Sequence, residues 1–261
     1  MGKLTTYFWY LFEYLKLGDI QSVLNAISYL LFKKSHRNDR ILKTSTGLFF
    51  CRKQTNDFQF ANFRYEWNVK QFIIGRISDY NVFIDGGACT GEYSIWLAQN
   101  GYHCFAFEPV SSNFEVLRKN IELNGLSGKI TAFQIGLGKQ KYIHTIDFDP
   151  VNTGASSLLI EKVDHEKQMV QVDAFDSMIP QMNLDSASKV LFKLDVEGME
   201  ADAISGAARL IEQIGDILFI IEVKHSGRQK VIDTLNSLAC FEIGDVDRFN
   251  IYARKIGKLI K

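Results

Sequence analysis

Two acidic residues end successive apolar runs in this sequence, and each is followed by residues that turn the chain. Asp85 follows Val82-Phe83-Ile84 and precedes a glycine-rich turn, whereas Glu108 follows Phe105-Ala106-Phe107 and precedes Pro109. The two acids are about 20 residues apart, which is the usual spacing for an acid that binds the ribose of a nucleotide cofactor. A carboxylate at the end of a second strand can accept hydrogen bonds from both ribose hydroxyls. We therefore predict that Glu108 binds a ribose.

The turn after Asp85 reads Gly86-Gly87-Ala88-Cys89-Thr90-Gly91. Glycine has no Cβ, so its three glycines allow a sharp turn and the close approach of a ligand. A dinucleotide-binding turn has the pattern G-x-G-x-x-G and holds a pyrophosphate at a helix N-terminus, and this turn lacks that spacing. An acid before the turn suits a cofactor with an amino group and a sulfonium charge. These features favour S-adenosylmethionine over NAD; the alternative is a glycine turn with a structural role only.

Transfer of a methyl group from such a cofactor requires an acceptor atom in line with the sulfonium methyl, and a base wherever the acceptor must lose a proton. Candidate catalytic residues follow two later apolar runs: Asp195, Glu197 and His225. Asp195 and Glu197, with Glu222 as a third oxygen ligand, are also an alternative site for a divalent ion, although we predict no metal. For Glu197 the other interpretation is a carboxylate in the first turn of a helix, where the helix dipole stabilises it.

The elements that would position these residues follow a βαβ pattern. From residue 81 onward, short apolar runs alternate with helical patterns, which is typical of a mostly parallel sheet. The predicted parallel strands are 82–85, 103–108, 130–135, 190–195 and 217–223, and the predicted helices are 61–77, 92–100, 112–124, 201–214 and 227–239. A short strand is expected at 48–51, and two last strands, 241–246 and 250–254, form an antiparallel hairpin. The long connection 139–169 is expected to carry a short hairpin and a flap at 149–157.

Several motifs together resemble the FkbM family of methyltransferases. They are Ile84-Asp85-Gly86-Gly87-Ala88-Cys89-Thr90-Gly91, Phe107-Glu108-Pro109 and Lys193-Leu194-Asp195-Val196-Glu197-Gly198-Met199-Glu200, with further matches at residues 152–158 and 172–176. The resemblance covers roughly residues 44–225. It implies an α/β fold with a doubly wound, mostly parallel seven-stranded sheet, the Rossmann-like class I methyltransferase fold. Gly136 and Lys139 depart from the family pattern, which more often has alanine and an acid there.

The resemblance also implies a set of cofactor-binding residues and an activity. Tyr65 and Glu66 would lie near the methionine end of S-adenosylmethionine, and the remaining contacts would come from Asp85, Gly86, Gly87, Gly91, Glu108 and Pro109. The implied reaction is O-methylation of a hydroxyl on a sugar, glycan or related metabolite. Two alternatives stay open, a non-catalytic cofactor-binding scaffold and an NAD-dependent oxidoreductase.

The N-terminal residues, 4–32, differ from the βαβ region in their pattern of apolar residues. Residues 4–17 are rich in aromatic and aliphatic side chains, but Glu13 and Lys16 interrupt the run, which is shorter than the roughly 20 apolar residues of a spanning helix. Residues 4–17 and residues 20–32 predict two short amphipathic helices, and we predict no transmembrane segment. We therefore expect an N-terminal helical extension over residues 1–41 and a methyltransferase domain over residues 42–261. Peripheral membrane contact and a homodimer formed through the extension are alternatives to simple packing on the domain.

The composition narrows the partners and the compartment. Thirty basic residues balance thirty acidic ones among 261, so no overall field attracts nucleic acid, and none is expected as a partner. The four cysteines form no CxxC pair, and the chain has no Asn-x-Ser/Thr site. A cytoplasmic protein acting on a small-molecule or glycan acceptor is the simplest expectation.

Overall fold

A seven-stranded sheet forms the centre of the computed structural model, which describes residues 3–32, 35–149, 151, 153, 166–185 and 187–259. Its order is β11-β12-β10-β9-β3-β4-β5. The strands are β3 (Val82–Gly86), β4 (His103–Phe107), β5 (Ile130–Phe133), β9 (Lys189–Leu194), β10 (Asp216–Glu222), β11 (Cys240–Asp245) and β12 (Asn250–Gly257). Five strands are parallel, and the β11–β12 hairpin is antiparallel beside β10. The predicted fold class is confirmed, including the hairpin at the sheet edge.

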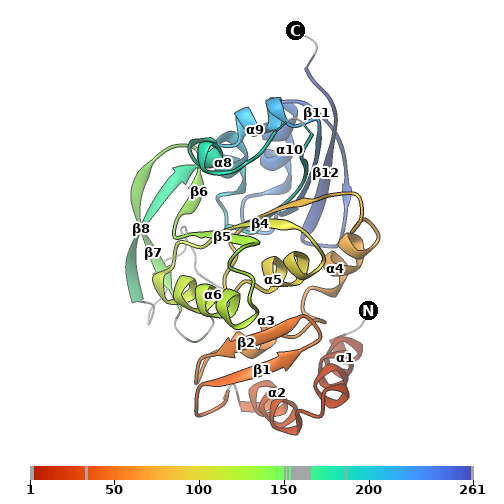
Figure 1. The fold of residues 1–261 in the computed structure, drawn as a ribbon, viewed down its shortest axis with the longest axis vertical. Helices are drawn as coiled ribbons and strands as arrows, with labels where there is room; N and C mark the ends of the chain where they lie inside the picture. The colour runs from red at the N-terminus through yellow and green to blue at the C-terminus, as the bar shows by residue number, and fades with distance from the viewer. Residues whose placement is uncertain are drawn as a thin grey trace.

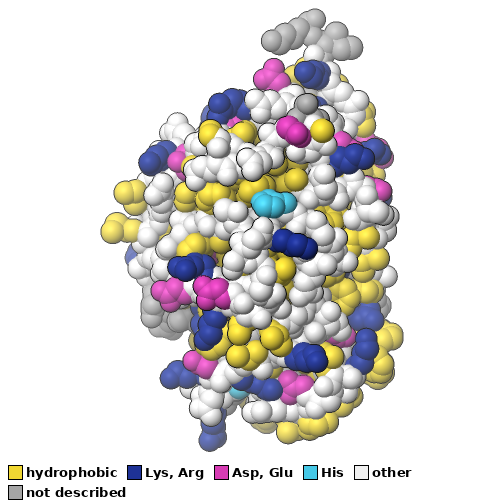
Figure 2. Space-filling view, in the orientation of Figure 1, with side chains coloured by type: hydrophobic (Ala, Val, Ile, Leu, Met, Phe, Trp, Pro, Cys, Tyr) yellow, Lys and Arg dark blue, Asp and Glu magenta, His cyan; other side chains and the backbone are white. Residues whose placement is uncertain are grey.

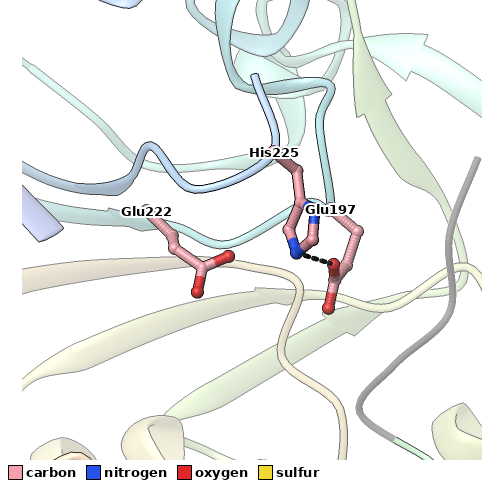
Figure 3. A group of neighbouring side chains, drawn as sticks. All are labelled: Glu197, Glu222 and His225. Carbon is pink, nitrogen blue, oxygen red and sulfur yellow. Dashed lines mark ion pairs between the residues drawn. The ribbon is translucent and has the colours of Figure 1, made fainter. Parts of the chain in front are cut away.

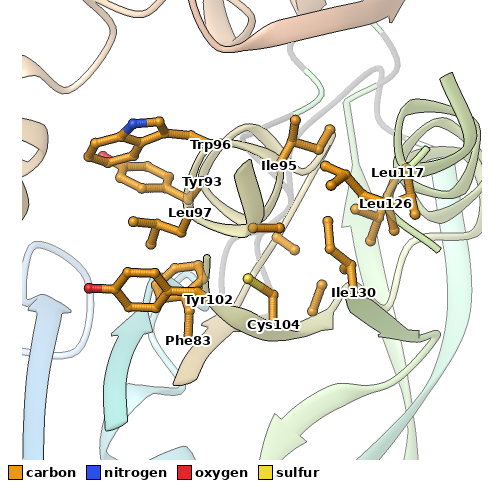
Figure 4. Packing of buried hydrophobic residues seen from close by; sticks show 14 of the residues in the cluster. Phe83, Tyr93, Ile95, Trp96, Leu97, Tyr102, Cys104, Leu117, Leu126 and Ile130 are labelled. Carbon is orange, nitrogen blue, oxygen red and sulfur yellow. The ribbon is translucent and has the colours of Figure 1, made fainter. Parts of the chain in front are cut away.

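Helices cover both faces of this sheet (Figure 1). One face carries α4 (Trp67–Ile74), α5 (Glu92–Gln99) and α6 (Ser111–Leu123), and the other carries α8 (Glu200–Ser205), α9 (Ala208–Gln213) and α10 (Arg228–Asn236). The central strands are apolar on both sides, as expected of a covered parallel sheet. Figure 4 shows Leu97 of α5 on the side of Phe83 and Tyr102, and Ile95 of the same helix on the side of Leu117; all five residues belong to one apolar core. Val82 and Ile84 point to the opposite core.

Two predicted helices are shorter or interrupted. The predicted helix 201–214 is broken between α8 and α9 at Gly206, where a Cβ would lie 2.0 Å from the carbonyl oxygen of Gly138. Within the predicted helix 61–77, only α4 forms, after the short α3 (Asp57–Phe60). The residue before α4 is Glu66, which has a left-handed backbone with φ of 49°. Tertiary contacts therefore override helical periodicity at both places.

A three-stranded sheet lies beside the central one, formed by β6 (Gly136–Gly138), β7 (Tyr142–Phe148) and β8 (Glu166–Ala174) in the order β6-β8-β7. It is followed by α7 (Phe175–Met178) and the 3-10 turn η1 (Ile179–Gln181). β7 and β8 pair as an antiparallel hairpin, but residues 149–165 connect the two strands, so the loop expected at 149–157 belongs to the hairpin and does not follow it. The predicted flap at 149–157 lies outside the described residues except at positions 149, 151 and 153.

The N-terminal residues form the two predicted helices, α1 (Lys3–Lys16) and α2 (Ile20–Phe32). They are followed by an antiparallel hairpin of β1 (Arg40–Thr44) and β2 (Gly47–Cys51), of which only β2 was predicted. The predicted domain boundary at residues 41 and 42 falls inside β1, and that division stays a prediction. Among the residues that the structure describes, no helix is both long enough and apolar enough to cross a bilayer.

Candidate functional site

The glycine-rich turn between β3 and α5 lies against the end of β9. Gly87 has φ of +85°, and a Cβ there would lie 1.9 Å from the carbonyl oxygen of Asp195. Gly91 has φ of +88°, and its missing Cβ leaves room for Leu117. The backbone N–H groups of Gly87 and Ala88 donate to the carbonyl of Phe107 in β4. The turn is therefore fixed between the ends of β4 and β9, the place where open α/β sheets bind ligands.

Glu108 follows β4 and faces a pocket beside this turn. Its two carboxylate oxygens accept hydrogen bonds from the backbone N–H groups of Cys89 and Val110, each at 2.9 Å. Burial raises the pKa of Glu108 to about 7. The surrounding cavity, called here the Glu108 pocket, has a volume of about 640 Å³ and is mostly apolar; its lining residues are Gly87, Cys89, Phe107, Glu108, Pro109, Val110, Asn113, Ile135, Gly136, Leu137, Ile146, Thr153, Val170, Val172, Asp195, Val196 and Glu197.

A second, more polar cavity adjoins the first at Gly87. This Glu66 pocket has a volume of about 410 Å³ and is lined by Phe60, Tyr65, Glu66, Asp85, Gly87, Ala88, Cys89, Glu92, Tyr93, Lys193 and Asp195. The two pockets share Gly87, Cys89 and Asp195. A ligand that bends around the Gly87 turn would therefore place an apolar end in one pocket and a charged end in the other.

Opposite charges are paired inside the Glu66 pocket. The Lys193 ammonium lies 2.9 Å from Asp195 Oδ2 and 3.8 Å from Glu66 Oε2, and the Tyr93 hydroxyl donates to the same Glu66 oxygen at 2.8 Å. Burial opposes the charge of Lys193, but the carboxylates of Asp195, Glu66 and Asp85 keep the pKa of Lys193 well above its usual value. Lys193 is therefore a cation at neutral pH.

Asp85 lies deeper in the same pocket and is buried. Its Oδ2 accepts a hydrogen bond from the Ser94 hydroxyl at 2.7 Å. Burial raises the pKa of Asp85 to about 6, although Lys193 and the Ser94 hydroxyl act in the opposite direction.

A cluster of Glu197, Glu222 and His225 lies at the carboxyl ends of β9 and β10 (Figure 3). His225 Nε2 is 3.3 Å from Glu197 Oε2, and one ligand atom from each of the three side chains lies within 4.8 Å of the others. Burial, together with the charges of Asp195 and Glu197, raises the pKa of Glu222 to about 8. These residue types and distances are compatible with proton transfer and with binding of a divalent ion.

The loop that carries Glu197 is fixed by the next acid along the chain. Glu200 is fully buried, and its Oε1 accepts hydrogen bonds from the backbone N–H groups of Val196 and Gly198 at 3.0 and 3.2 Å. Glu197 itself has φ of +51°, a left-handed conformation uncommon outside glycine. Glu197 lies three residues before Glu200, where α8 begins, and its carboxylate contacts His225.

The predicted site residues are distributed over these features. Tyr65, Glu66 and Asp85 line the Glu66 pocket, Glu108, Pro109 and Glu197 line the Glu108 pocket, and Gly87 and Asp195 line both. Gly86 and Gly91 line neither pocket, and instead leave room for Leu194 and Leu117. His225 lines neither of them but contacts Glu197.

Sequence reasoning did not identify Tyr93, Asn113 and Thr153 as site residues. Thr153 is buried beside the Glu108 pocket, where its hydroxyl donates to Asp57 at 2.8 Å and its carbonyl accepts from the Asn113 side chain at 2.9 Å. The only signal for it was its place in the family-like stretch 152–158. Tyr93 and Asn113 occupy ordinary positions of predicted helices, and their roles come from tertiary contacts.

Comparisons with known proteins match methyltransferases by family model, by sequence and by structure. The sequence model of the methyltransferase FkbM domain matches residues 85–249. A protein described as Methyltransferase 1 from Beauveria bassiana is 28% identical over 160 residues, which is 52% of this chain and 62% of that protein. The chain thus spans less than two thirds of this relative.

Solved structures with a similar arrangement include a methyltransferase FkbM from Methylobacillus flagellatus, with a TM-score of 0.49 and 18% identity over 76% of this chain and 53% of that one. Another is precorrin-6Y C5,15-methyltransferase from Geobacter metallireducens, with a TM-score of 0.43 and 15% identity over 72% of this chain and 88% of that one.

Proposed function

We propose that this chain, which belongs to the FkbM methyltransferase family, transfers the methyl group of S-adenosylmethionine to a hydroxyl of a sugar, glycan or related metabolite. The observation that carries the proposal is the pair of pockets that meet at Gly87, Cys89 and Asp195. One pocket is mostly apolar and has a carboxylate, and the other contains acids and a lysine. S-adenosylmethionine has the same division between its adenosine and its charged amino-acid end.

The Glu108 pocket suits the adenosine. Each oxygen of Glu108 accepts one backbone hydrogen bond and still has a lone pair for a ribose hydroxyl. The walls formed by Phe107, Ile135 and Leu137 suit the flat faces of an adenine. Pro109 continues the same wall after β4.

The Glu66 pocket suits the methionine part. Glu66 and Asp85 are acceptors for an ammonium group, and the Lys193 ammonium is a donor for a carboxylate. Tyr65 adds an aromatic wall beside them, and it packs edge-on against Phe60 with ring centroids 5.1 Å apart. The sulfonium would then lie near Gly87 and Asp195, where the two pockets meet.

Asp195, Glu197 and His225 are assigned to the acceptor. When bound, S-adenosylmethionine supplies an activated methyl group. The three side chains orient the acceptor hydroxyl, and one of them accepts its single proton as the new O–C bond forms and the S–C bond breaks. Because the methyl carbon is already activated, holding the acceptor oxygen in line accounts for much of the acceleration. Residence in the cytoplasm and the absence of a nucleic-acid partner stay predictions.

Calorimetric titration with S-adenosylmethionine, S-adenosylhomocysteine, NAD and NADP tests the cofactor assignment. We expect binding of the first two only, and at least about tenfold weaker binding in Glu108→Ala, a loss of about 1.4 kcal/mol. Glu115→Ala removes an exposed acid on α6 and is the matched control. Equal affinity in both variants, or preference for a nicotinamide cofactor, would reject the assignment.

Methyl transfer to a panel of sugars and polyols tests the reaction. His225→Gln should lower turnover while leaving the affinity for S-adenosylhomocysteine nearly unchanged, because His225 lines neither cofactor pocket. Intact cofactor binding with no transfer to any hydroxyl acceptor would favour the non-catalytic scaffold.

A further inference from the structure

The Glu197–Glu222–His225 cluster brings together three ligand types from separate parts of the chain. Glu222 is the last residue of β10, His225 follows it in the next loop, and Glu197 belongs to the loop between β9 and α8. Figure 3 shows the carboxylate of Glu222 facing the side where His225 and Glu197 meet. All three side chains are partly buried, so they are enclosed but reachable from solvent.

We propose that Glu197, Glu222 and His225 bind a divalent metal ion. Ligand atoms at about 2.2 Å from one tetrahedral ion lie about 3.6 Å from one another. The three ligand atoms of the cluster lie within 4.8 Å of one another, so side-chain movements of up to about 1 Å would bring them to one ion. Two carboxylates and one imidazole suit Mn²⁺, Fe²⁺ or Zn²⁺ better than Ca²⁺, which prefers oxygen ligands alone.

The local charges favour an ion at this position. Glu197, Glu222 and the neighbouring Asp195 bring three carboxyl groups to the same strand ends. The ammonium of Lys193 already lies 2.9 Å from Asp195 and 3.8 Å from Glu66. A divalent ion would balance the two carboxylates of the cluster while His225 binds it as neutral imidazole.

The site deepens the proposed function and rests on it for its role. Three protein ligands leave coordination positions open for oxygen atoms of an acceptor. An ion held by the three side chains would supply Lewis acidity to an acceptor hydroxyl, and Asp195, two residues from Glu197, would accept the proton of that hydroxyl. The preferred acceptor class is then a compound with neighbouring hydroxyl groups, both of which can bind the ion.

Titration with Mn²⁺ in the absence of any cofactor tests the site directly, with free Mn²⁺ measured by electron paramagnetic resonance. We expect one ion per chain, at least tenfold weaker binding in Glu222→Gln, and unchanged binding in Glu212→Gln, which alters an exposed acid on α9. Bound Mn²⁺ should show nitrogen hyperfine coupling that His225→Asn removes.

Two outcomes would overturn the metal site: no Mn²⁺ bound at about 1 mM, or equal binding in Glu222→Gln and Glu212→Gln, which means an adventitious ion only. Parallel titration with S-adenosylhomocysteine separates the proposals. Cofactor binding without Mn²⁺ binding rejects the metal site alone, whereas loss of cofactor binding rejects the proposed function.

A separate observation concerns the outer face of α1 and α2. Phe8, Phe12 and Leu15 lie at helical spacing on α1, and the same spacing on α2 gives Ile20, Leu24, Ile27 and Leu31. These side chains are between 39% and 68% exposed. Figure 2 shows apolar side chains along the lower edge of the molecule, over these helices. Contiguous apolar surface of this kind marks an interaction site.

The opposite sides of both helices are fixed to the domain. Tyr14 is buried and donates a hydrogen bond to the carbonyl of Phe58, and Val23, Ala26 and Tyr29 pack on the core. The apolar stripes therefore point outward on a rigid support and are not available to cover the domain itself.

The charges around these stripes suit an anionic surface. Residues 1–40 contain six basic and three acidic residues. Each acid is engaged: Asp19 pairs with Arg40 at 3.0 Å, Asp39 accepts a hydrogen bond from the backbone N–H of Lys53, and Glu13 accepts one from Ser45. Lys16 and Arg37 are exposed. From the exposed stripes and this charge bias we infer that α1 and α2 lie on a lipid bilayer with anionic headgroups.

Vesicle sedimentation tests the membrane contact. The full chain should bind vesicles of mixed phosphatidylcholine and phosphatidylserine, bind phosphatidylcholine alone less, and lose at least tenfold affinity in Leu24→Glu/Leu31→Glu. The control, Ile143→Glu/Ile256→Glu, removes equally exposed apolar residues elsewhere and should bind normally. Absence of vesicle binding would overturn the proposal. If the wild-type chain also forms a dimer and the Leu24→Glu/Leu31→Glu variant is a monomer, the apolar stripes bind a second copy instead.

Discussion

Replacement of Gly87 by alanine should be more damaging than an ordinary substitution of glycine, because two separate effects add. Gly87 has φ of +85°, and a left-handed backbone costs a residue with a Cβ about 1–2 kcal/mol. The new Cβ would also lie 1.9 Å from the backbone oxygen of Asp195, so the end of β9 must move. Forcing atoms into a packed interior costs a further 1–3 kcal/mol or so. The expected total is about 2–5 kcal/mol.

Gly101→Ala separates the two effects. Gly101 has φ of +96°, but a Cβ there would meet nothing within 4 Å, so only the backbone cost of about 1–2 kcal/mol applies. Calorimetric unfolding should lower the Tm of Gly101→Ala by roughly 2–8 °C and that of Gly87→Ala by roughly 4–20 °C. Because Gly87 and Asp195 line both pockets, affinity for S-adenosylhomocysteine should fall at least about tenfold in Gly87→Ala only. Equal losses of stability and unchanged affinity in both variants would refute the reasoning.

Three further predictions concern charged groups in the pockets. Burial raises the pKa of Glu108 from 4.5 to about 7. The folded state therefore holds the proton more tightly than the unfolded state, and the stability of the cofactor-free protein should fall as pH rises from 4.5 to about 7. Cofactor affinity should show the opposite trend and weaken as pH falls from about 8 to about 6, since the ribose needs the carboxylate. Calorimetry of Glu108→Gln should give weaker binding with a smaller dependence on pH, of which the part that remains comes from Asp85. Lys193→Met should destabilise the fold by about 2–4 kcal/mol in urea unfolding, because its partly buried carboxylate partners lose their counter-charge, whereas the exposed Lys189→Met should change it by less than about 0.5 kcal/mol. Tyr93→Phe should lower the free energy of unfolding by about 1–2 kcal/mol, because it removes the hydrogen bond to Glu66. A change near zero in urea unfolding would argue against that bond.

The central sheet was predictable because its signals are local. Buried parallel strands read as short apolar runs, and β3, β4, β9 and β10 lie within one or two residues of the predicted ranges. Parallel strands end at the same edge, so the meeting of Asp85, Glu108 and Asp195 followed from the order of the elements. By contrast, β1 reads Arg-Ile-Leu-Lys-Thr, with no continuous apolar run, and forms through pairing with β2.

The pairing of charges could not be read from the sequence. Glu66 precedes Lys193 by more than 100 residues, and their contact depends on how the turn before α4 is placed over the sheet. Periodicity predicted an uninterrupted helix there, although Glu66 has a left-handed backbone with its side chain bonded to Tyr93. The same contacts that broke the prediction build the polar pocket, as expected where local rules give way at functional sites.

The segment before the family match is part of the site rather than an appendage to it. The match begins at residue 85, yet Phe60, Tyr65 and Glu66 line the Glu66 pocket. Arg52 links this segment to α6, because its guanidinium donates to Asp57 at 2.8 and 2.9 Å and to Asn113 of α6 at 2.9 Å. Asp57 in turn binds the hydroxyl of Thr153 beside the Glu108 pocket. One run of contacts from β2 to α4 thus supports both halves of the proposed cofactor site, so the smallest part of the chain able to bind the cofactor must begin before residue 52.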